Sequence, residues 1–115
     1  MTPFGERVRA LREERGLSLT DMARGLRVSS AYLSALEHGK RGRPSKLLVR
    51  QVCTYFNIIW DEAEELERLA QLSHPRVVVD TRGLSARATE LANRLARDIK
   101  RLPDSTLDRI LKELG

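Results

Sequence analysis

Apolar residues recur along most of this chain at spacings of three and four, in short segments that glycine, serine or proline separates. Such spacing places apolar side chains on one face of an α-helix. Hydrophobic residues make up 41% of the chain and aromatic residues only 4%, so the core must be largely aliphatic. This balance favours helices over a β-sandwich. A length of 115 residues permits one compact domain, or a small domain with an appendage.

The spacing predicts five helices in the first part of the chain and two near its end. Ser18 with Asp21, and Asp61 with Glu64, have the pattern of helix N-terminal caps, and Ser45 after a proline begins another helix. The expected helices cover about residues 4–15, 19–25, 29–38, 45–56, 61–73, 85–102 and 104–114.

A valine-rich segment interrupts the helical pattern after Pro75. Val77, Val78 and Val79 are β-branched, and we expect them to form a short strand. One strand is not stable alone, and no second strand is evident in the sequence. The sequence therefore predicts that this strand pairs with the same segment of a second copy.

Charge is distributed unevenly along the chain. Residues 1–50 carry a net charge of +6, residues 51–74 a net charge of −4, and residues 75–115 a net charge of +3. With a pI of about 10.0, a polyanionic partner is plausible. No signal-peptide pattern and no long apolar run is present, so we expect a soluble, cytoplasmic protein with no membrane partner.

Few residues suit catalysis or metal binding. The single cysteine, Cys53, has no partner for a disulfide and is expected to be a small core residue. No cysteine and histidine cluster has zinc-site spacing, so neither a metal nor a cofactor is predicted. Only His38 and His74 are available as histidines, and both are expected to be structural or to face a ligand. The sequence therefore does not predict an enzyme.

Two short helices joined by a tight turn, within a bundle of about five, form the arrangement that places a helix in the DNA major groove. Residues 17–29, the small Ala23, the apolar pair Leu33 and Leu36, and the exit Glu37-His38-Gly39-Lys40 resemble the Cro/CI-type helix-turn-helix regulators of the XRE family. The resemblance covers about residues 4–70. The predicted fold is all-α, with a five-helix DNA-binding domain in residues 1–74. A short strand and a two-helix extension follow in residues 75–115.

The resemblance also implies which residues contact DNA. The helix from Ser29 to Glu37 is the recognition helix. None of the residues that it is predicted to place against the bases is a large side chain, such as arginine or glutamine, that makes two hydrogen bonds to one base. Leu19 stands where many relatives have a glutamine that touches the DNA backbone, and Thr20 is a substitute for that contact. Arg27 stands where the family usually has a turn glycine, so either the turn is distorted or Arg27 is kept for its charge. The predicted base contacts are Ser30, Ala31, Tyr32 and Ser34. The predicted backbone contacts are Ser18, Thr20, Ser29, Lys40, Arg41, Arg43 and Lys46.

The segment Lys40–Lys46, called the basic loop below, places four cations directly after the predicted recognition helix. Phosphate contacts by such cations supply affinity that does not depend on base sequence. An alternative is that Arg41-Gly42-Arg43-Pro44, which looks like the core of an AT-hook, enters the minor groove of A·T-rich DNA. A loop that is only solvated is a further alternative.

Regulators of this type usually bind as two-fold dimers with half-sites about 34 Å apart. Residues 75–115 are the predicted dimerisation region. An alternative is that the helices of this region pack back on the DNA-binding domain of their own chain. We expect a sequence-specific, dimeric transcriptional repressor of double-stranded DNA that acts by occluding a promoter. The alternatives are an antitoxin-type autorepressor whose C-terminal helices bind a partner protein, or a nucleoid-type binder of low specificity. The predicted dimerisation residues are Val77, Val78, Val79, Leu91, Leu95 and Ile99.

Overall fold

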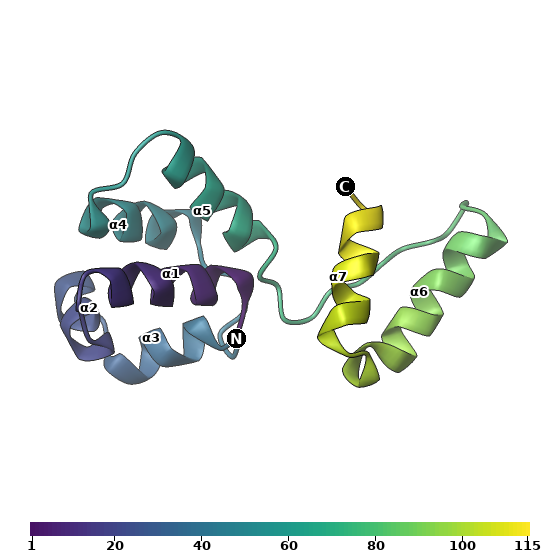
Figure 1. Ribbon diagram of the computed structural model, residues 1–115, viewed down its shortest axis with the longest axis horizontal. Coiled ribbons are helices and arrows are strands. Elements are labelled where there is room, and N and C mark those ends of the chain that lie inside the picture. Colours follow the sequence, from purple (N-terminus) through teal and green to yellow (C-terminus); the bar gives the residue numbers. More distant parts are fainter. The chain divides into compact units, whose positions relative to one another are not determined.

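Seven α-helices and one short 3₁₀-helix form the regular structure of the computed structural model, which describes residues 1–115 (Figure 1). The chain divides into two compact units, Met1–Val77 and Val78–Gly115. The first unit holds α1 (Pro3–Glu14), α2 (Leu19–Leu26), α3 (Ser30–Glu37), α4 (Lys46–Phe56) and α5 (Asp61–Gln71). The second unit holds α6 (Ala86–Asp98), η1 (Ile99–Arg101) and α7 (Asp104–Glu113).

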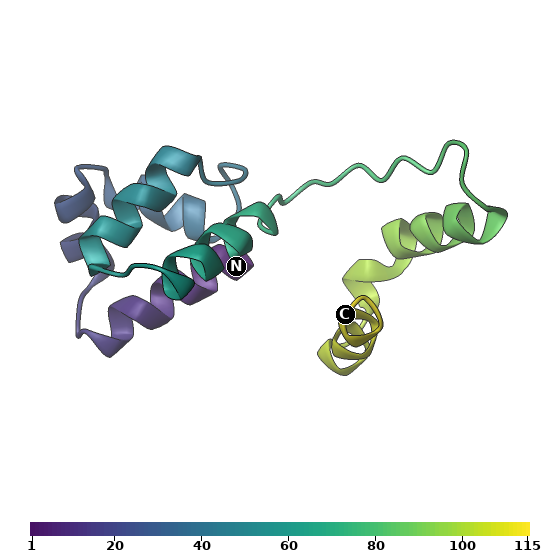
Figure 2. The same cartoon turned by 90° about the horizontal axis from the view of Figure 1, so that it is seen from above.

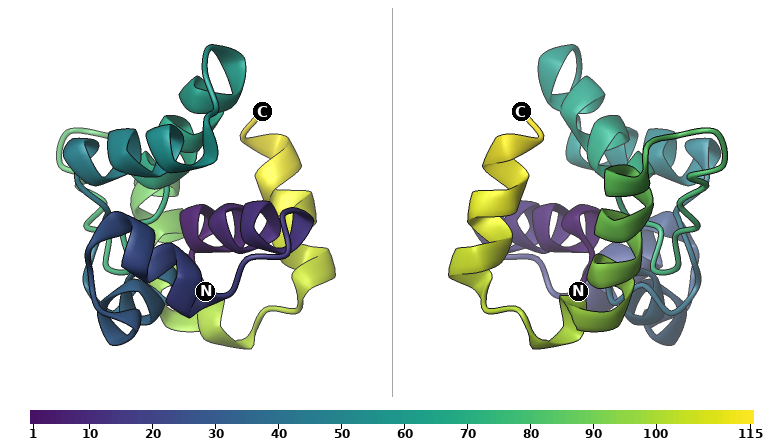
Figure 3. Two further views of the ribbon diagram at one scale, coloured as in Figure 1. Left: turned by 90° about the vertical axis from the view of Figure 1, so that its left-hand side faces the viewer. Right: turned by 90° about the vertical axis from the view of Figure 1, so that its right-hand side faces the viewer.

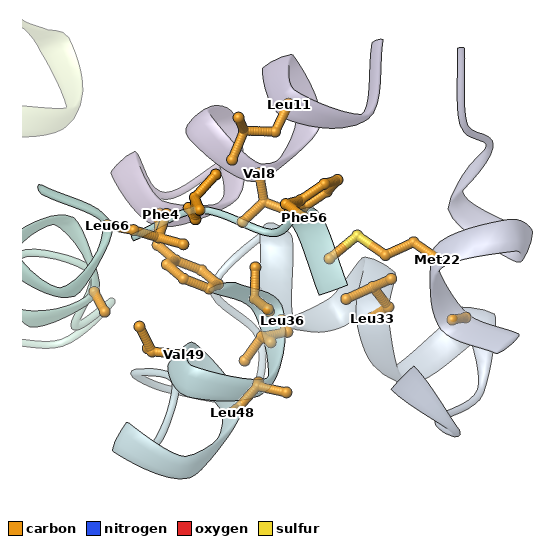
Figure 4. Close-up of a cluster of buried hydrophobic side chains, with 14 residues drawn as sticks. Phe4, Val8, Leu11, Met22, Leu33, Leu36, Leu48, Val49, Phe56 and Leu66 are labelled. Carbon is orange, nitrogen blue, oxygen red and sulfur yellow. The ribbon is translucent and has the colours of Figure 1, made fainter. Parts of the chain in front are cut away.

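The first unit is built around α1, which contacts both α3 and α5 (Figure 1 and Figure 3). Helix α2 contacts α3 and α4, and α4 contacts α5, so every helix of the unit is tied to at least two others. The apolar faces that the spacing predicts meet in one largely aliphatic core, which also holds two phenylalanine rings (Figure 4). Its buried members are Phe4, Val8, Leu11, Met22, Ala23, Leu33, Leu36, Leu48, Val49, Val52, Phe56, Ile58, Leu66 and Ala70.

The two ends of the first unit are joined by a buried hydrogen bond. The Phe4 backbone N–H donates to the Ser73 hydroxyl at 2.9 Å, and this hydroxyl donates to the Leu69 carbonyl at 2.6 Å. A helix leaves its first backbone N–H groups without a partner inside the helix. Ser73, just after α5, therefore satisfies a donor in the first turn of α1.

Side-chain caps begin several helices where the sequence predicts them. The Ser18 hydroxyl accepts from the Asp21 N–H at 2.9 Å, and the Asp21 carboxylate accepts from the Ser18 N–H at 3.0 Å. The Ser18 amide, followed by the Ser18 hydroxyl, lowers the pKa of the Asp21 carboxyl. The Ser45 hydroxyl caps α4 by accepting from the Leu48 N–H at 3.1 Å, without a returned side-chain bond. These short polar side chains fix where each helix starts.

The start of α5 differs from the prediction. Asp61 is the first residue of the helix, and Trp60 occupies the cap position with φ of 54° and no side-chain hydrogen bond. Asp61 and Glu64 therefore do not form a cap. Together with Glu62 they place three carboxylates in the first turn, where the helix dipole favours negative charge.

The strand predicted at Val77–Val79 is absent, and the predicted fold class is wrong in this respect. Residues 77–80 have no regular secondary structure (Figure 2), and all three valine side chains are exposed. A strand needs a neighbour whose backbone groups complete its hydrogen bonds. No segment of this chain supplies one, so the β-branched composition alone does not produce a strand.

The second unit is a helical hairpin with little core of its own. Ser85 caps α6, with its hydroxyl 3.2 Å from the Ala88 nitrogen. Neither α6 nor α7 contains a buried residue. Leu91, Ile99, Leu111 and Leu114 are all more than half exposed. The amphipathic faces of these helices are therefore only partly covered by each other.

Candidate nucleic-acid interface

Helices α2 and α3, with the turn between them, form a helix-turn-helix pair. Met22 and Ala23 of α2 and Leu33 and Leu36 of α3 are buried in the same core, which fixes the two helices against each other. The Ser29 hydroxyl accepts from the Tyr32 N–H at 3.0 Å and begins α3. The core therefore holds α3 through Leu33 and Leu36, and the Ser29 cap fixes where the helix begins.

The turn between these helices is regular although it lacks the usual glycine. Arg27 adopts the left-handed conformation with φ of 59° and ψ of 41°, and its N–H donates to the Arg24 carbonyl at 3.2 Å. The Val28 N–H donates to the Ala23 carbonyl at 3.0 Å, which satisfies another carbonyl at the end of α2. Of the two alternatives given for Arg27, the distorted turn is not observed, and the turn holds a non-glycine residue in the left-handed conformation at a cost of about 1 kcal/mol.

The side chains of α3 that are not buried are uncharged, and most of them are small. Ala31 is exposed, and Ser30, Tyr32 and Ser34 are half-buried. The structure thus brings the four predicted base-contacting residues onto one eight-residue helix. Hydroxyl groups, a methyl group and one aromatic ring are available on this surface for contacts to base edges.

A buried ion pair fixes the end of α3 to α1. The Arg12 Nη2 atom lies 3.0 Å from Glu37 Oε1 and 3.1 Å from Glu37 Oε2. The Glu37 backbone carbonyl also accepts from the Thr2 N–H at 3.0 Å. Gly5 makes this approach possible, because a Cβ atom there would lie 2.1 Å from the Glu37 carbonyl oxygen. The sequence did not predict this pair, because Arg12 and Glu37 are 25 residues apart and no local pattern around either residue indicates the other as its partner.

The basic loop follows α3 and has no regular structure up to Ser45, and its last residue, Lys46, is the first residue of α4. Gly39 and Gly42 have positive φ values of 79° and 77°, which lets the chain turn twice in a short distance. Pro44 is buried, and it anchors the loop to the first unit. All four cations of the loop are exposed, and no carboxylate lies within ion-pair distance of any of them. They are Lys40, Arg41, Arg43 and Lys46.

One of these cations reaches back to α3. The Arg41 guanidinium carbon lies 5.6 Å from the centroid of the Tyr32 ring, which is a cation–π contact. The structure therefore joins a predicted backbone-contacting residue to a predicted base-contacting residue. Helical spacing did not reveal this contact, since Arg41 lies beyond the end of α3.

The remaining predicted backbone contacts lie at helix starts. Ser18 and Ser29 are the N-caps of α2 and α3, and Thr20 is an exposed residue in the first turn of α2. Each cap hydroxyl already accepts a hydrogen bond from its helix. A hydroxyl that accepts can still donate, so both remain able to bind a phosphate oxygen.

The predicted dimerisation residues lie after the helix-turn-helix region. Val77, Val78 and Val79 are in the segment before α6, Leu91 and Leu95 are in α6, and Ile99 begins η1. Leu95 is half-buried and the other five are exposed.

Cys53 lies half-buried at the edge of the core. Burial, followed by the charge of Glu67, raises the pKa of its thiol. A thiol of this kind is a poor nucleophile at neutral pH, which agrees with its predicted packing role. No helix of the structure has the length and apolar character that crossing a lipid bilayer requires.

Two short helices fixed at a left-handed turn, with the second helix held by caps and a buried ion pair, define a helix-turn-helix protein. A family model described as a helix-turn-helix domain matches residues 3–74, and the chain belongs to this family. This match confirms the resemblance to helix-turn-helix regulators that the residues of α2 and α3 predict.

Curated relatives share the same region. The chain is 39% identical over 61 residues to the HTH-type transcriptional repressor RghR of Bacillus subtilis, covering 53% of this chain and 45% of that protein. It is 40% identical over 62 residues to the HTH-type transcriptional regulator DdrOP3 of Deinococcus deserti, covering 54% of this chain and 48% of that protein. The matched region thus spans about half the length of these relatives. No solved structure matches the chain.

Proposed function

We propose that this protein is a sequence-specific, double-stranded DNA-binding transcriptional regulator of the Cro/CI type. The observation that carries the proposal is the combination of a rigidly held α3 with an uncharged outer surface and four unpaired cations directly after it. Cations of this kind bind the phosphate backbone, whereas small polar groups on a helix read base edges. The names of the relatives, a repressor and a regulator of transcription, support the same class.

In this proposal residues 1–74 are the DNA-binding domain, and α3 is the recognition helix in the major groove. The bases are contacted from the first turns of α3, and the backbone is contacted from the caps of α2 and α3 and from the basic loop. The base-contacting set is Ser30, Ala31, Tyr32 and Ser34. The backbone-contacting set is Ser18, Thr20, Ser29, Lys40, Arg41, Arg43 and Lys46.

Residues 75–115 form the dimerisation region in this proposal. The support is the second unit itself, which has amphipathic helices and no buried side chain. A unit of this size does not bury enough apolar surface to fold alone. A second copy supplies the missing surface through the side chains of Val77, Val78, Val79, Leu91, Leu95 and Ile99.

A homodimer of this kind represses transcription in the cytoplasm by occupying a promoter and excluding polymerase. Two DNA-binding domains related by a two-fold axis require an operator with two-fold symmetry. The symmetry of the bound sequence is therefore the property that distinguishes this function from DNA binding without sequence preference.

The decisive experiment selects fragments of the host genome with the full chain at about physiological salt, where non-specific affinity is only about 10⁻⁴ to 10⁻⁶ M. We expect a few sites that share a two-fold motif. Broad recovery of A·T-rich fragments contradicts sequence-specific regulation and supports an architectural binder. Recovery of no duplex DNA refutes DNA binding altogether.

Sedimentation equilibrium tests the dimer independently of DNA. The variant carrying Leu91→Glu and Ile99→Glu places two charges on the exposed apolar face, and we expect it to sediment as a monomer. Asn93→Glu adds a charge to the other side of α6 and serves as the matched control. A native chain that is already monomeric, or a double variant that remains dimeric, contradicts this interface.

A further inference from the structure

The recognition helix lacks a strong base reader of its own. Within Ser30–Glu37 the only charged side chain is Glu37, which is buried and paired with Arg12. A guanine is read most specifically by an arginine or lysine that donates to its N7 and O6 atoms. No residue of α3 can make that contact.

Arg41 supplies such a group to the helix from outside it. Tyr32 is the third residue of α3, and the Arg41 guanidinium lies against its ring at 5.6 Å. The Lys40 N–H donates to the Ala35 carbonyl at 2.8 Å, which turns the chain back directly after α3. A cation that follows the last turn of α3 is therefore held beside the ring of a first-turn residue.

The contact leaves the hydrogen-bond donors of Arg41 available. A guanidinium that packs on an aromatic ring keeps its N–H groups free for a planar partner. Arg41 is exposed, and no carboxylate lies within ion-pair distance of it. Packing on the ring also restricts a long side chain before it binds, which reduces the entropy lost on binding.

We infer that Tyr32 and Arg41 act as one reading unit, in which the Tyr32 ring holds the Arg41 guanidinium so that it donates to N7 and O6 of a guanine in the major groove. Arg41 is the specificity-determining residue and Tyr32 is the positioning residue. The inference rests on the proposed DNA-binding function. It changes the role of Arg41 from a backbone contact to a base contact.

Arg43 provides a matched control in the same loop. It has the same charge and is also exposed, but it lines a groove of about 200 Å³ with Ser45 and Glu67 and forms no cation–π contact. Replacing Arg43 therefore removes a loop cation without disturbing the Tyr32 contact.

The test uses the operator that the native chain selects from the genome. Binding of the full chain to every single-base variant of one half-site is measured by fluorescence anisotropy at constant salt. We expect the native protein to prefer guanine at one position by roughly 5- to 150-fold over other bases. In the Arg41→Ala protein, we expect the preference for guanine to fall to about 1 at that position alone. In the Arg43→Ala protein, we expect the affinity for every half-site sequence to fall by one common factor.

Variants of Tyr32 separate positioning from packing. Tyr32→Phe retains a ring and is expected to keep the guanine preference, whereas Tyr32→Leu retains apolar bulk without a ring and loses most of it. Thermal unfolding of each variant verifies that the fold is intact. Equal guanine preference in the phenylalanine and leucine variants contradicts the positioning role.

Another result overturns the reading role of Arg41. If Arg41→Ala weakens binding to all half-site variants equally, and makes the negative slope of log K against log salt shallower by about 0.9, then Arg41 contacts a phosphate only. Failure of the native chain to select any motif refutes the proposed function, and the reading unit with it. The contact itself is checked in the free protein by NMR. If the contact forms, the Tyr32 ring shifts the Arg41 side-chain protons upfield, and Tyr32→Leu removes that shift. Arg41 protons without such a shift show that the contact is absent.

Discussion

Replacing Glu37 by glutamine tests whether the buried ion pair holds α3 in place. The side chains of Arg12 and Glu37 are only 10% and 3% exposed. Glutamine keeps the size of glutamate and one acceptor oxygen, but it leaves the Arg12 guanidinium buried without a counter-charge. Breaking a buried pair from one side costs about 3 to 5 kcal/mol. Because one hydrogen bond is retained, we expect the free energy of unfolding to fall by about 3 kcal/mol.

The measurement is urea unfolding of the full chain followed by circular dichroism at 222 nm. For a slope of about 1 to 2 kcal/mol/M, a loss of 3 kcal/mol lowers the midpoint by about 1.5 to 3 M. Typical total stabilities are about 5 to 15 kcal/mol, so this change is readily measured.

A double variant separates the charge from the shape of the site. The Arg12 Nε atom is buried without a hydrogen-bond partner, so the native pair is incompletely satisfied. Replacing a buried pair by apolar residues of similar volume is often nearly neutral. We therefore expect the variant with Arg12→Met and Glu37→Leu to lie within about 1 kcal/mol of the native protein. A loss below about 1 kcal/mol in Glu37→Gln, or a double variant as unstable as the sum of its singles, refutes this reasoning.

Three further predictions concern local geometry, and each is measured by urea unfolding. Gly5→Ala places a methyl group 2.1 Å from the Glu37 carbonyl oxygen. We therefore expect the free energy of unfolding to fall by about 1 to 2 kcal/mol, despite the better helix propensity of alanine. Unchanged stability would mean that the backbone moves away from the methyl group without cost. Asp21 has its pKa lowered below the ordinary 3.8 by Ser18, so its contribution is present above pH 3.8 and is lost as the pH falls through the lower folded value. The stability difference between the native protein and Asp21→Asn should therefore shrink below that pH, and a difference independent of pH contradicts the assignment. Arg27→Gly relieves a left-handed non-glycine conformation and should raise stability by about 0.5 kcal/mol, whereas a decrease would show that the arginine side chain stabilises the turn.

The sequence predicted the features that depend only on residues close together in the chain, which are the helix caps and the apolar helix faces. The cap formed by Ser18 and Asp21 depends on residues three apart, and the apolar faces of α1 and α4 depend on a fixed helical period. Both are therefore readable without any knowledge of the rest of the chain. The same reasoning failed for Asp61, because the backbone at Trp60 turns with a positive φ before the helix begins.

Features that depend on distant partners were not predictable in the same way. Val77–Val79 has the composition of a strand, but a strand exists only where a second one completes it. The pair Arg12 and Glu37 and the contact of Arg41 with Tyr32 join different elements. The set of residues on α3 could be predicted from the motif, whereas the interactions that position them required the structure.

The hydrogen bond between the Phe4 amide and the Ser73 hydroxyl has a consequence for synthesis of the protein. Donor and acceptor are separated by 69 residues. At about 5 to 20 residues per second, a ribosome needs about 3 to 14 seconds to add them. Glu37 precedes Leu66 by 29 residues, so for about 1.5 to 6 seconds of that interval the segment Leu19–Glu37 is complete while Leu66 and Ala70 of the core have not yet been added. The nascent helix-turn-helix pair therefore exists for seconds with an exposed apolar surface that attracts chaperones and proteases.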